Sequence, residues 1–337
     1  DAFVRGVREV WPGCVIQWED FKHYNALRIL DRYRDDVPSF NDDVQGTAAV
    51  VVAGVISALR HLGQELRGQR ILLVGAGAAG IGIGRLLRGA MEDEGMTAAD
   101  VARSLALADT RGLVHAGRDD LDDTKRDLAV PAPATAPGDD LAAVVDHVRP
   151  TILVGTTGVA GTFSEAAIRT MAAHTARPII LPLSNPTANT EAVPSDLMDW
   201  TDGRALVATG SPFDAVTHAG TTYPVAQANN VLVFPGLGLG AIVSEASRIS
   251  DAMLLTAART LADAVPPDRV AAGALYPALS DLRGVSRSIA VAVAREAVAS
   301  GLAPEVGDDE LDRAVDAAMW WPAYVPYAPA PERRRPT

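Results

Sequence analysis

Two acidic pairs near the N-terminal end could bind a divalent cation. Glu19 and Asp20 end the segment VIQWED, and Asp42 and Asp43 begin DDVQG about two dozen residues later. Carboxylate oxygens are the ligands that Mg²⁺ and Mn²⁺ prefer. Acidic pairs usually lie on solvated surfaces, but these follow a buried-looking strand and adjoin a very apolar helix, where carboxylates are costly without a cation. If three of these four carboxylates lie close together in the fold, they form a metal site with oxygen ligands only.

A dinucleotide-binding fingerprint lies between a strand and a helix. The segment GAGAAG places Gly75, Gly77 and Gly80 in the order G-x-G-x-x-G, directly after the apolar run ILLVG. The first glycine permits a tight turn, the second lets the backbone approach a pyrophosphate, and the third allows close helix–strand packing. Ala78 and Ala79 open the helix, whose free N–H groups and positive dipole end attract phosphate. Because strand, glycines and helix occur together, the segment predicts a dinucleotide site.

The residues after the second strand leave the choice between NAD and NADP open. Asp109 closes the run SLALAD and is the candidate for the adenosine ribose hydroxyls, although it lies 29 residues after Gly80, a longer spacing than the usual value of about 20. Its negative charge favours NAD. The small Thr110 and several nearby cations favour NADP, because these cations could reach a 2′-phosphate: Arg111, Arg118, Lys125 and Arg126.

Strand-like apolar runs alternate with helical patterns, which is typical of a parallel α/β sheet. Strands are expected at 71–75, 104–109, 151–155, 178–183, 205–210 and 230–236, and earlier at 15–20. Helices are expected at 23–36, 78–92, 139–148, 163–175, 237–247, 250–264, 286–300 and 308–319. Ser286 is the expected N-cap and Gly301 the expected C-terminal stop of the helix at 286–300. FNDDVQG is expected to be a polar loop that opens a long apolar helix.

These patterns predict an α/β fold: a Rossmann-type doubly wound parallel sheet inserted into a second, partly missing α/β domain, with a helical C-terminal segment. Residues 1–41 and 231–302 are assigned to a substrate and metal domain. Residues 42–230 form the predicted NAD(P)-binding Rossmann domain, and 303–337 a C-terminal helix and extended tail.

The amino-acid composition argues against some classes of binding partner. The net charge of −12 argues against nucleic-acid or anionic-membrane binding, which selects for basic surfaces. The run TAAVVVAGVISAL at 47–59 is shorter than a bilayer span of about 20 residues. A single cysteine, Cys14, fits a reducing cytoplasm and a buried structural thiol. The six histidines have no metal-ligand spacing, and the start at Asp1 fits a recombinant piece or a proteolytic product.

Several segments together resemble successive signature segments of malic enzymes. They are WEDF at 18–21, FNDDVQGTAAV at 40–50, GAGAAGIGIG at 75–84, LSNPT at 183–187 and QANNVLVFPG at 227–236. MWWPAYVPY at 319–327 is similar to the C-terminal segment of the longer, eukaryote-like subgroup. The resemblance implies a metal site at Glu19, Asp20 and Asp43.

The same resemblance implies roles for further residues. Asp42 matches the acidic partner of the family's lysine base, a catalytic position. Asn185 and Asn230 match the amides that touch the substrate and the nicotinamide side, and Thr47 and Gly155 lie where the family contacts its cofactor. Ala228 stands where the family often has glycine.

The reaction implied is the oxidative decarboxylation of L-malate to pyruvate and CO₂, with NAD or NADP and with Mg²⁺ or Mn²⁺. The family's lysine base, tyrosine acid and substrate-binding arginine precede the WEDF-like segment, and none has a counterpart here; the lysines are Lys22 and Lys125 alone. The chain is therefore expected to bind dinucleotide but to turn malate over poorly. Dimers or tetramers are expected, since family members form them.

Two alternatives stay open at this point. A malolactic-type enzyme would keep its NAD bound and release lactate, and accumulation of reduced cofactor separates it from a malic enzyme. A non-catalytic nucleotide-binding module, acting as a sensor or assembly subunit, would require a native chain that starts near Asp1, which mass spectrometry can test.

Overall fold

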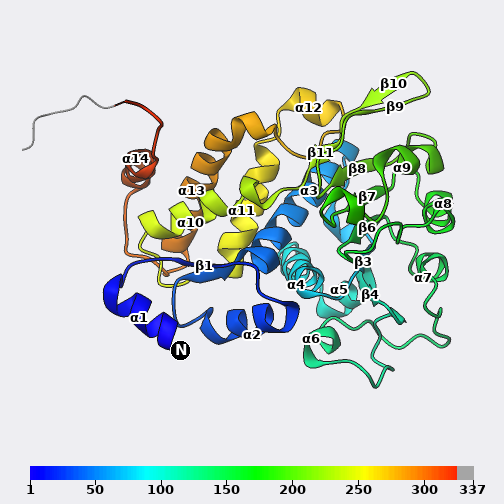
Figure 1. The fold of residues 1–337 in the computed structure, drawn as a ribbon, viewed down its shortest axis with the longest axis horizontal. Helices are drawn as coiled ribbons and strands as arrows, with labels where there is room; N and C mark the ends of the chain where they lie inside the picture. Colours follow the sequence, from blue (N-terminus) through cyan, green and yellow to red (C-terminus); the bar gives the residue numbers. More distant parts are fainter. Residues whose placement is uncertain (325–337) are drawn as a thin grey trace, which may run out of the picture.

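A seven-stranded sheet forms one end of the molecule. The computed structural model describes residues 1–324, and the predicted segment at 319–327 lies partly outside them. The strand order is β11-β8-β7-β6-β3-β4-β5, parallel except for β5 (Figure 1). The strands are β3 (Ile71–Val74), β4 (Leu105–Asp109), β5 (Gly112–Leu113), β6 (Ile152–Gly155), β7 (Ile179–Pro182), β8 (Leu206–Thr209) and β11 (Ala226–Gln227).

The predicted doubly wound topology is confirmed. Strand β3 pairs with β4 on one side and with β6 on the other, so the chain reverses its winding direction between β3 and β6. Successive side chains of β3 point to opposite faces and enter two separate cores: Ile71 and Leu73 in one, Leu72 and Val74 in the other. A sheet covered on both faces explains why its strands are short, continuous apolar runs.

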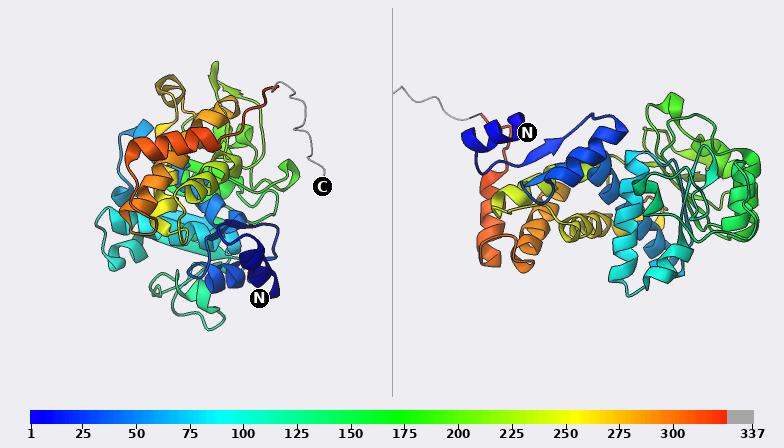
Figure 2. Two further views of the ribbon diagram at one scale, coloured as in Figure 1. Left: turned by 90° about the vertical axis from the view of Figure 1, so that its left-hand side faces the viewer. Right: turned by 90° about the horizontal axis from the view of Figure 1, so that it is seen from below.

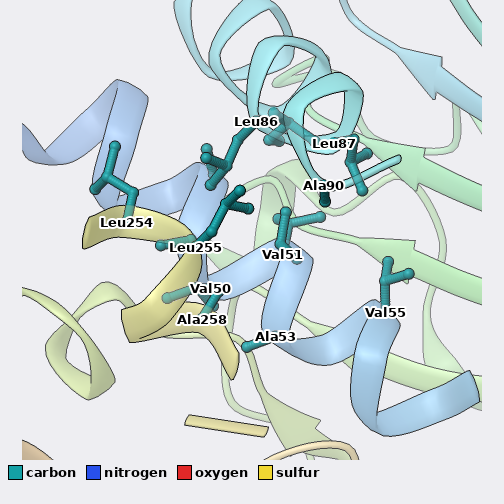
Figure 3. Close-up of a cluster of buried hydrophobic side chains, with 14 of the residues drawn as sticks. Val50, Val51, Ala53, Val55, Leu86, Leu87, Ala90, Leu254, Leu255 and Ala258 are labelled. Atoms are coloured by element: carbon teal, nitrogen blue, oxygen red, sulfur yellow. The ribbon is translucent and has the colours of Figure 1, made fainter. Parts of the chain in front are cut away.

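Helices pack against both faces of the sheet. One face contacts α4 (Ala78–Asp93) and the long helix α3 (Thr47–Leu62), and the other contacts α7 (Leu141–Val148) and α8 (Glu165–His174). The shorter helices are α5 (Ala98–Ser104), α6 (Asp123–Arg126) and α9 (Pro194–Trp200). Figure 3 shows the contact of α3 with α4 and α11, which the aliphatic side chains of Val51, Leu87 and Leu255 help to fill.

A helical lobe extends away from the sheet (Figure 2). Its helices are α10 (Phe234–Val243), α11 (Asp251–Asp263), α12 (Pro267–Ala271), α13 (Leu282–Ala299) and α14 (Asp308–Ala318). One continuous core joins this lobe to the sheet through α3, and the domain boundaries at 41, 230 and 302 stay a prediction. The helical stretch Asp42–Leu62 is long and apolar enough to cross a membrane, but most of it is buried within the protein, as expected of a core helix.

The N-terminal segment lies beneath the helical lobe in Figure 1. It contains α1 (Ala2–Val10), β1 (Ile16–Trp18), α2 (His23–Tyr33) and β2 (Ser39–Asn41), and β1 and β2 form a two-stranded parallel sheet. Cys14 is partly rather than fully buried, and it packs on the small cluster of Val4, Ile16, Trp18 and Val37.

Three local predictions are wrong. The run at 230–236 is a 3₁₀ turn (Asn230–Leu232) followed by the start of α10, not a strand, because a short apolar run fits a buried helix equally well. Helix α13 begins at Leu282, so Ser286 is buried inside it rather than capping it, whereas Gly301 does adopt the left-handed conformation after its end. FNDDVQG is not a loop: it completes β2 and forms a π-helical turn (Asp42–Gly46) that continues into α3.

The sequence analysis did not anticipate several short elements, among them α1, α9, a hairpin and strand β5. Strands β9 (Val216–His218) and β10 (Thr221–Tyr223) form an antiparallel hairpin that projects beyond the sheet in Figure 1. Their mixture of polar and apolar residues is too short for a clear alternation. Strand β5 is antiparallel to β4 in a sheet predicted to be parallel, because only Thr110 and Arg111 separate the two strands and no crossover is possible.

Candidate functional site

Three of the predicted metal ligands converge in the structure. Glu19 and Asp20 follow β1, and Asp43 lies in the π-helical turn that follows β2. Because β1 and β2 are parallel, their carboxyl ends meet at the same edge. One carboxylate oxygen from each of the three residues lies within 4.8 Å of the other two. Residues 23 positions apart in sequence therefore come within reach of a single ion.

The backbone around Asp20 is held in an unusual conformation. Its φ angle is 60°, in the left-handed region that few residues other than glycine adopt. The Asp20 N–H donates to Asp43 Oδ2 at 2.9 Å, which ties the end of β1 to the π-helical turn. Strained backbone of this kind clusters at functional sites, because only the surrounding structure can maintain it.

Asp42 differs from its neighbours because its side chain is buried. Burial raises the pKa of Asp42 to about 7, partly offset by the Asn230 hydrogen bond, and the negative charges of Glu19 and Asp43 raise it further. Asn230 Nδ2 donates to Asp42 Oδ2 at 3.1 Å, while Asp42 Oδ1 is buried without a partner. The site thus retains an unsatisfied acceptor, as expected of a group whose partner is a cation or a protonated base.

These carboxylates line a cavity of about 690 Å³ at the carboxyl edge of the sheet. Asn185, after β7, and Asn230, after β11, both line it, as the sequence predicts. Among the described residues, the lining contains four carboxylates but no lysine, arginine or tyrosine. A strongly acidic site built from oxygen donors fits Mg²⁺ or Mn²⁺ in charge and ligand type.

Thr47 lies in this cavity rather than in the nucleotide pocket. Its hydroxyl accepts a hydrogen bond from Asn230 Nδ2 at 3.0 Å, and the same amide nitrogen lies 3.1 Å from the backbone oxygen of Asp42. Asn230 therefore links the segment after β11 to the π-helical turn and to the start of α3 by hydrogen bonds. It also lines the cavity.

A second pocket, of about 470 Å³, surrounds the glycine-rich turn. Gly75 has φ 115°, and a Cβ there would lie 2.7 Å from the backbone of Thr156. A Cβ on Gly80 would overlap the carbonyl oxygen of Gly75, but one on Gly77 would meet nothing within 4 Å. Gly77 thus borders open space where a pyrophosphate can approach. Ala78 and Ala79 supply the first N–H groups of α4 beside it.

Asp109 borders the same pocket but is already paired with cations. Arg118 Nη1 and Nη2 lie 2.9 and 3.1 Å from its two oxygens, and Lys125 Nζ lies 2.7 Å from Oδ2. Burial opposes ionisation of Asp109, but the Arg118 and Lys125 hydrogen bonds outweigh it and lower its pKa. Arg118 and Lys125, which the sequence analysis considered as ligands of a 2′-phosphate, therefore neutralise the charge of Asp109.

Gly155 ends β6, and its contact with the cofactor stays a prediction. It is enclosed rather than pocket-lining: a Cβ there would lie 2.7 Å from the side chains of Glu191 and Phe163. The residues after it, Thr156 and Thr157, line the nucleotide pocket instead. Sequence analysis missed them and the buried Glu191; the only available signal was the position of the threonines directly after a predicted strand, where α/β proteins bind ligands.

The fold and the two pockets define a Rossmann-type dinucleotide-binding protein with a carboxylate cluster suited to a divalent cation. The family described as "Malic enzyme, NAD binding domain" matches residues 44–298. The chain is 42% identical over 334 residues to the NAD-dependent malic enzyme of Pseudomonas aeruginosa PAO1, and 43% identical over 332 residues to that of Aeromonas salmonicida. This chain belongs to the malic enzyme family.

Both alignments cover 97% of this chain but 59% of the relative. The chain thus spans less than two thirds of the length of these relatives. Solved structures agree: the malic enzyme of Entamoeba histolytica superposes with a TM-score of 0.75 at 25% identity, covering 94% of this chain and 61% of that protein. The malic enzyme from Pyrococcus horikoshii gives a TM-score of 0.75 at 26% identity, with 94% and 69% covered.

Proposed function

We propose that this chain carries the nucleotide and metal sites of an NAD-dependent malic enzyme, which oxidises L-malate and releases pyruvate and CO₂. The observation that carries the proposal is the convergence of Glu19, Asp20 and Asp43 at the rim of a cavity that Asn185 and Asn230 also line. A Rossmann dehydrogenase that uses no metal would have no use for this cluster.

The acidic cavity would bind the metal ion and malate, and the pocket around the glycine-rich turn would bind NAD. Glu19, Asp20 and Asp43 would hold Mg²⁺ or Mn²⁺, which when bound supplies Lewis-acid polarisation of the oxygen on C2 of malate. Asn185 offers an amide donor to a substrate carboxylate, and Asn230, whose amide donates to Asp42 and Thr47, borders the same space. The glycine-rich turn and the N-terminus of α4 would bind the pyrophosphate of NAD, so that its nicotinamide reaches the cavity and accepts the hydride.

NAD is the proposed cofactor, since the matched relatives are named NAD-dependent. Asp109 supports this choice, because it pairs with Arg118 and Lys125, two cations that could otherwise bind a 2′-phosphate. Its oxygens are occupied by Arg118 and Lys125, so a ribose hydroxyl would bind alongside or replace one of these contacts.

Proton transfer needs groups that this cavity does not contain. Oxidation requires a base for the 2-hydroxyl, and protonation of the enol requires an acid. Within the described part of the chain, the cavity lining offers no lysine or tyrosine for these steps. We propose that both come from the part of the longer relatives that this chain does not cover. Asp42, with its unpartnered Oδ1, is the group in this chain placed to accept a hydrogen bond from such a base.

Two assays test the proposal together. Residues 1–337 alone should bind NAD but produce little NADH from L-malate and Mn²⁺ in an absorbance assay. A protein extended to the full length of its relatives should produce NADH and pyruvate together, whereas a malolactic enzyme would release lactate without NADH. Steady turnover by the 337-residue chain would contradict the assignment of the base and acid to residues outside it.

A further inference from the structure

A fully buried carboxylate lies between the two pockets. Glu191, between β7 and α9, has no exposed surface, and no ion pair within residues 1–324 involves it. A buried charge without a cation is costly unless several hydrogen bonds satisfy it. Glu191 is not part of either pocket lining, so substrate binding does not explain its burial.

The donors to Glu191 come from two loops. Oε1 accepts from the Thr157 N–H at 2.8 Å, from the Thr157 hydroxyl at 2.9 Å and from the Ser184 hydroxyl. Oε2 accepts from the Ser184 N–H at 3.2 Å. Each carboxylate oxygen thus has at least one donor, and Oε1 has three, so hydrogen bonds take the place of a cation at this buried group. Thr157 belongs to the loop after β6, and Ser184 to the loop after β7.

Each loop serves a different pocket. Thr156, Thr157 and Val159 of the first loop line the nucleotide pocket. Asn185, directly after Ser184 in the second, lines the acidic cavity. A further hydrogen bond, from the Gly158 N–H to Ser184 Oγ at 2.8 Å, joins the same loops. The Glu191 side chain also packs where a Cβ of residue 155 would lie, which explains the glycine there.

We propose that Glu191 is a positioning residue that fixes the separation between bound nicotinamide and the substrate amide Asn185. This inference rests on the proposed function. Glu191 touches neither ligand; it acts through Thr157 on one side and Ser184 on the other. Its two oxygens accept from four donors, two of which are backbone N–H groups that cannot rotate away.

Glu191→Gln is the discriminating variant. Glutamine keeps the shape, but its amide nitrogen must face at least one of the N–H or O–H donors, and one loop must shift to separate them. In the enzyme extended to the length of its relatives, a misplacement of about 1 Å lowers the hydride-transfer rate by roughly 100-fold. The dissociation constant of NAD should change by less than about 3-fold, since the glycine-rich turn is untouched.

A second readout needs no turnover and uses residues 1–337. Mn²⁺ bound by the carboxylates should enhance relaxation of the nicotinamide protons of bound NAD in NMR spectra. Because this effect falls steeply with the distance between Mn²⁺ and each proton, a displaced nicotinamide should relax at a measurably different rate in Glu191→Gln. Glu165→Gln is the matched control, since Glu165 is exposed on α8 and pairs only with Arg169; it should behave as wild type.

Ser184→Ala keeps the carboxylate and removes one hydroxyl, so it should give a smaller change of the same sign even where Glu191→Gln does not fold. Wild-type relaxation together with a wild-type hydride-transfer rate in both variants, with only the thermal stability lowered, would overturn the positioning role and leave the proposed function standing. Absence of Mn²⁺-dependent relaxation in the wild-type chain would overturn both, because the cation would then not lie beside the nicotinamide.

Discussion

The nucleotide pocket and the acidic cavity are built in different ways. The glycine-rich turn of the first lies in one continuous stretch from β3 into α4. The second combines carboxylates after β1 and β2 with residues after β7 and β11. A local site depends on the backbone of a few adjacent residues, whereas a site assembled from distant segments depends on the contacts that hold them together. Substitutions should therefore damage the two regions in different ways.

The largest effect is expected at Gly80. Gly80→Ala places a methyl group against the Gly75 carbonyl and the Thr156 hydroxyl, which forces α4 away from β3. NAD binding should become undetectable by calorimetry, and the melting temperature should fall. Gly68→Ala is the matched control, because a Cβ there meets nothing within 4 Å. Normal NAD affinity in Gly80→Ala would show that the turn does not need this close approach.

Gly77 separates ligand binding from folding. A Cβ at this position meets no protein atom within 4 Å, so Gly77→Ala should leave the melting temperature unchanged. The added methyl group occupies the space of the pyrophosphate, and we expect a fall in NAD affinity of about 100-fold. Calorimetric titration checks this. An unchanged affinity would place the pyrophosphate elsewhere.

Asp109 tests cofactor choice. Asp109→Ala removes a charged hydrogen-bond acceptor and frees Lys125 to face the pocket, while Arg118 keeps its ion pair with Asp120. NAD affinity should fall by about 10-fold, the equivalent of one charged hydrogen bond, while NADP affinity should rise relative to it. Titrations with both nucleotides measure the ratio. Asp123→Ala, on the short helix α6 outside the pocket lining, is the control. A ratio that does not move would remove Asp109 from cofactor selection.

Asn230 tests the stability of the assembled cavity, because its side chain joins two of the segments that form it. Asn230→Ala removes the hydrogen bonds to Asp42 and Thr47 and leaves a buried carboxylate oxygen unpaired. The free energy of unfolding should fall by about 1–3 kcal/mol, measured by urea denaturation. Asn25→Ala on the exposed face of α2 should be neutral. Equal stability of the two variants would show that the cavity does not depend on this contact.

The same contrast explains what the sequence could predict. The strands and the glycine-rich turn follow from local patterns, because a covered parallel sheet requires apolar runs and the turn requires glycine at fixed offsets. The run at 230–236 was misjudged because an apolar stretch with proline and glycine fits both a strand and a buried helix. Local patterns also could not reveal that Arg118 and Lys125 neutralise Asp109, or that Glu191 joins two loops, since both depend on tertiary contacts.

The convergence of Glu19, Asp20 and Asp43 was proposed from chemistry and from family resemblance, not from spacing. Acidic pairs are common on surfaces, and only the parallel pairing of β1 with β2 brings these together. Their role as ligands remains a prediction.

Titration of the metal-free chain with Mn²⁺, followed by electron paramagnetic resonance of the free ion, tests that role most directly. We expect one tightly bound Mn²⁺ per chain, and a loss of affinity of more than about 100-fold in Asp43→Asn, since an oxygen-only site depends on the charge and number of its carboxylates. Asp36→Asn, at an exposed acidic residue outside the cluster, should bind as wild type does. Equal Mn²⁺ affinity in Asp43→Asn and wild type would contradict the account.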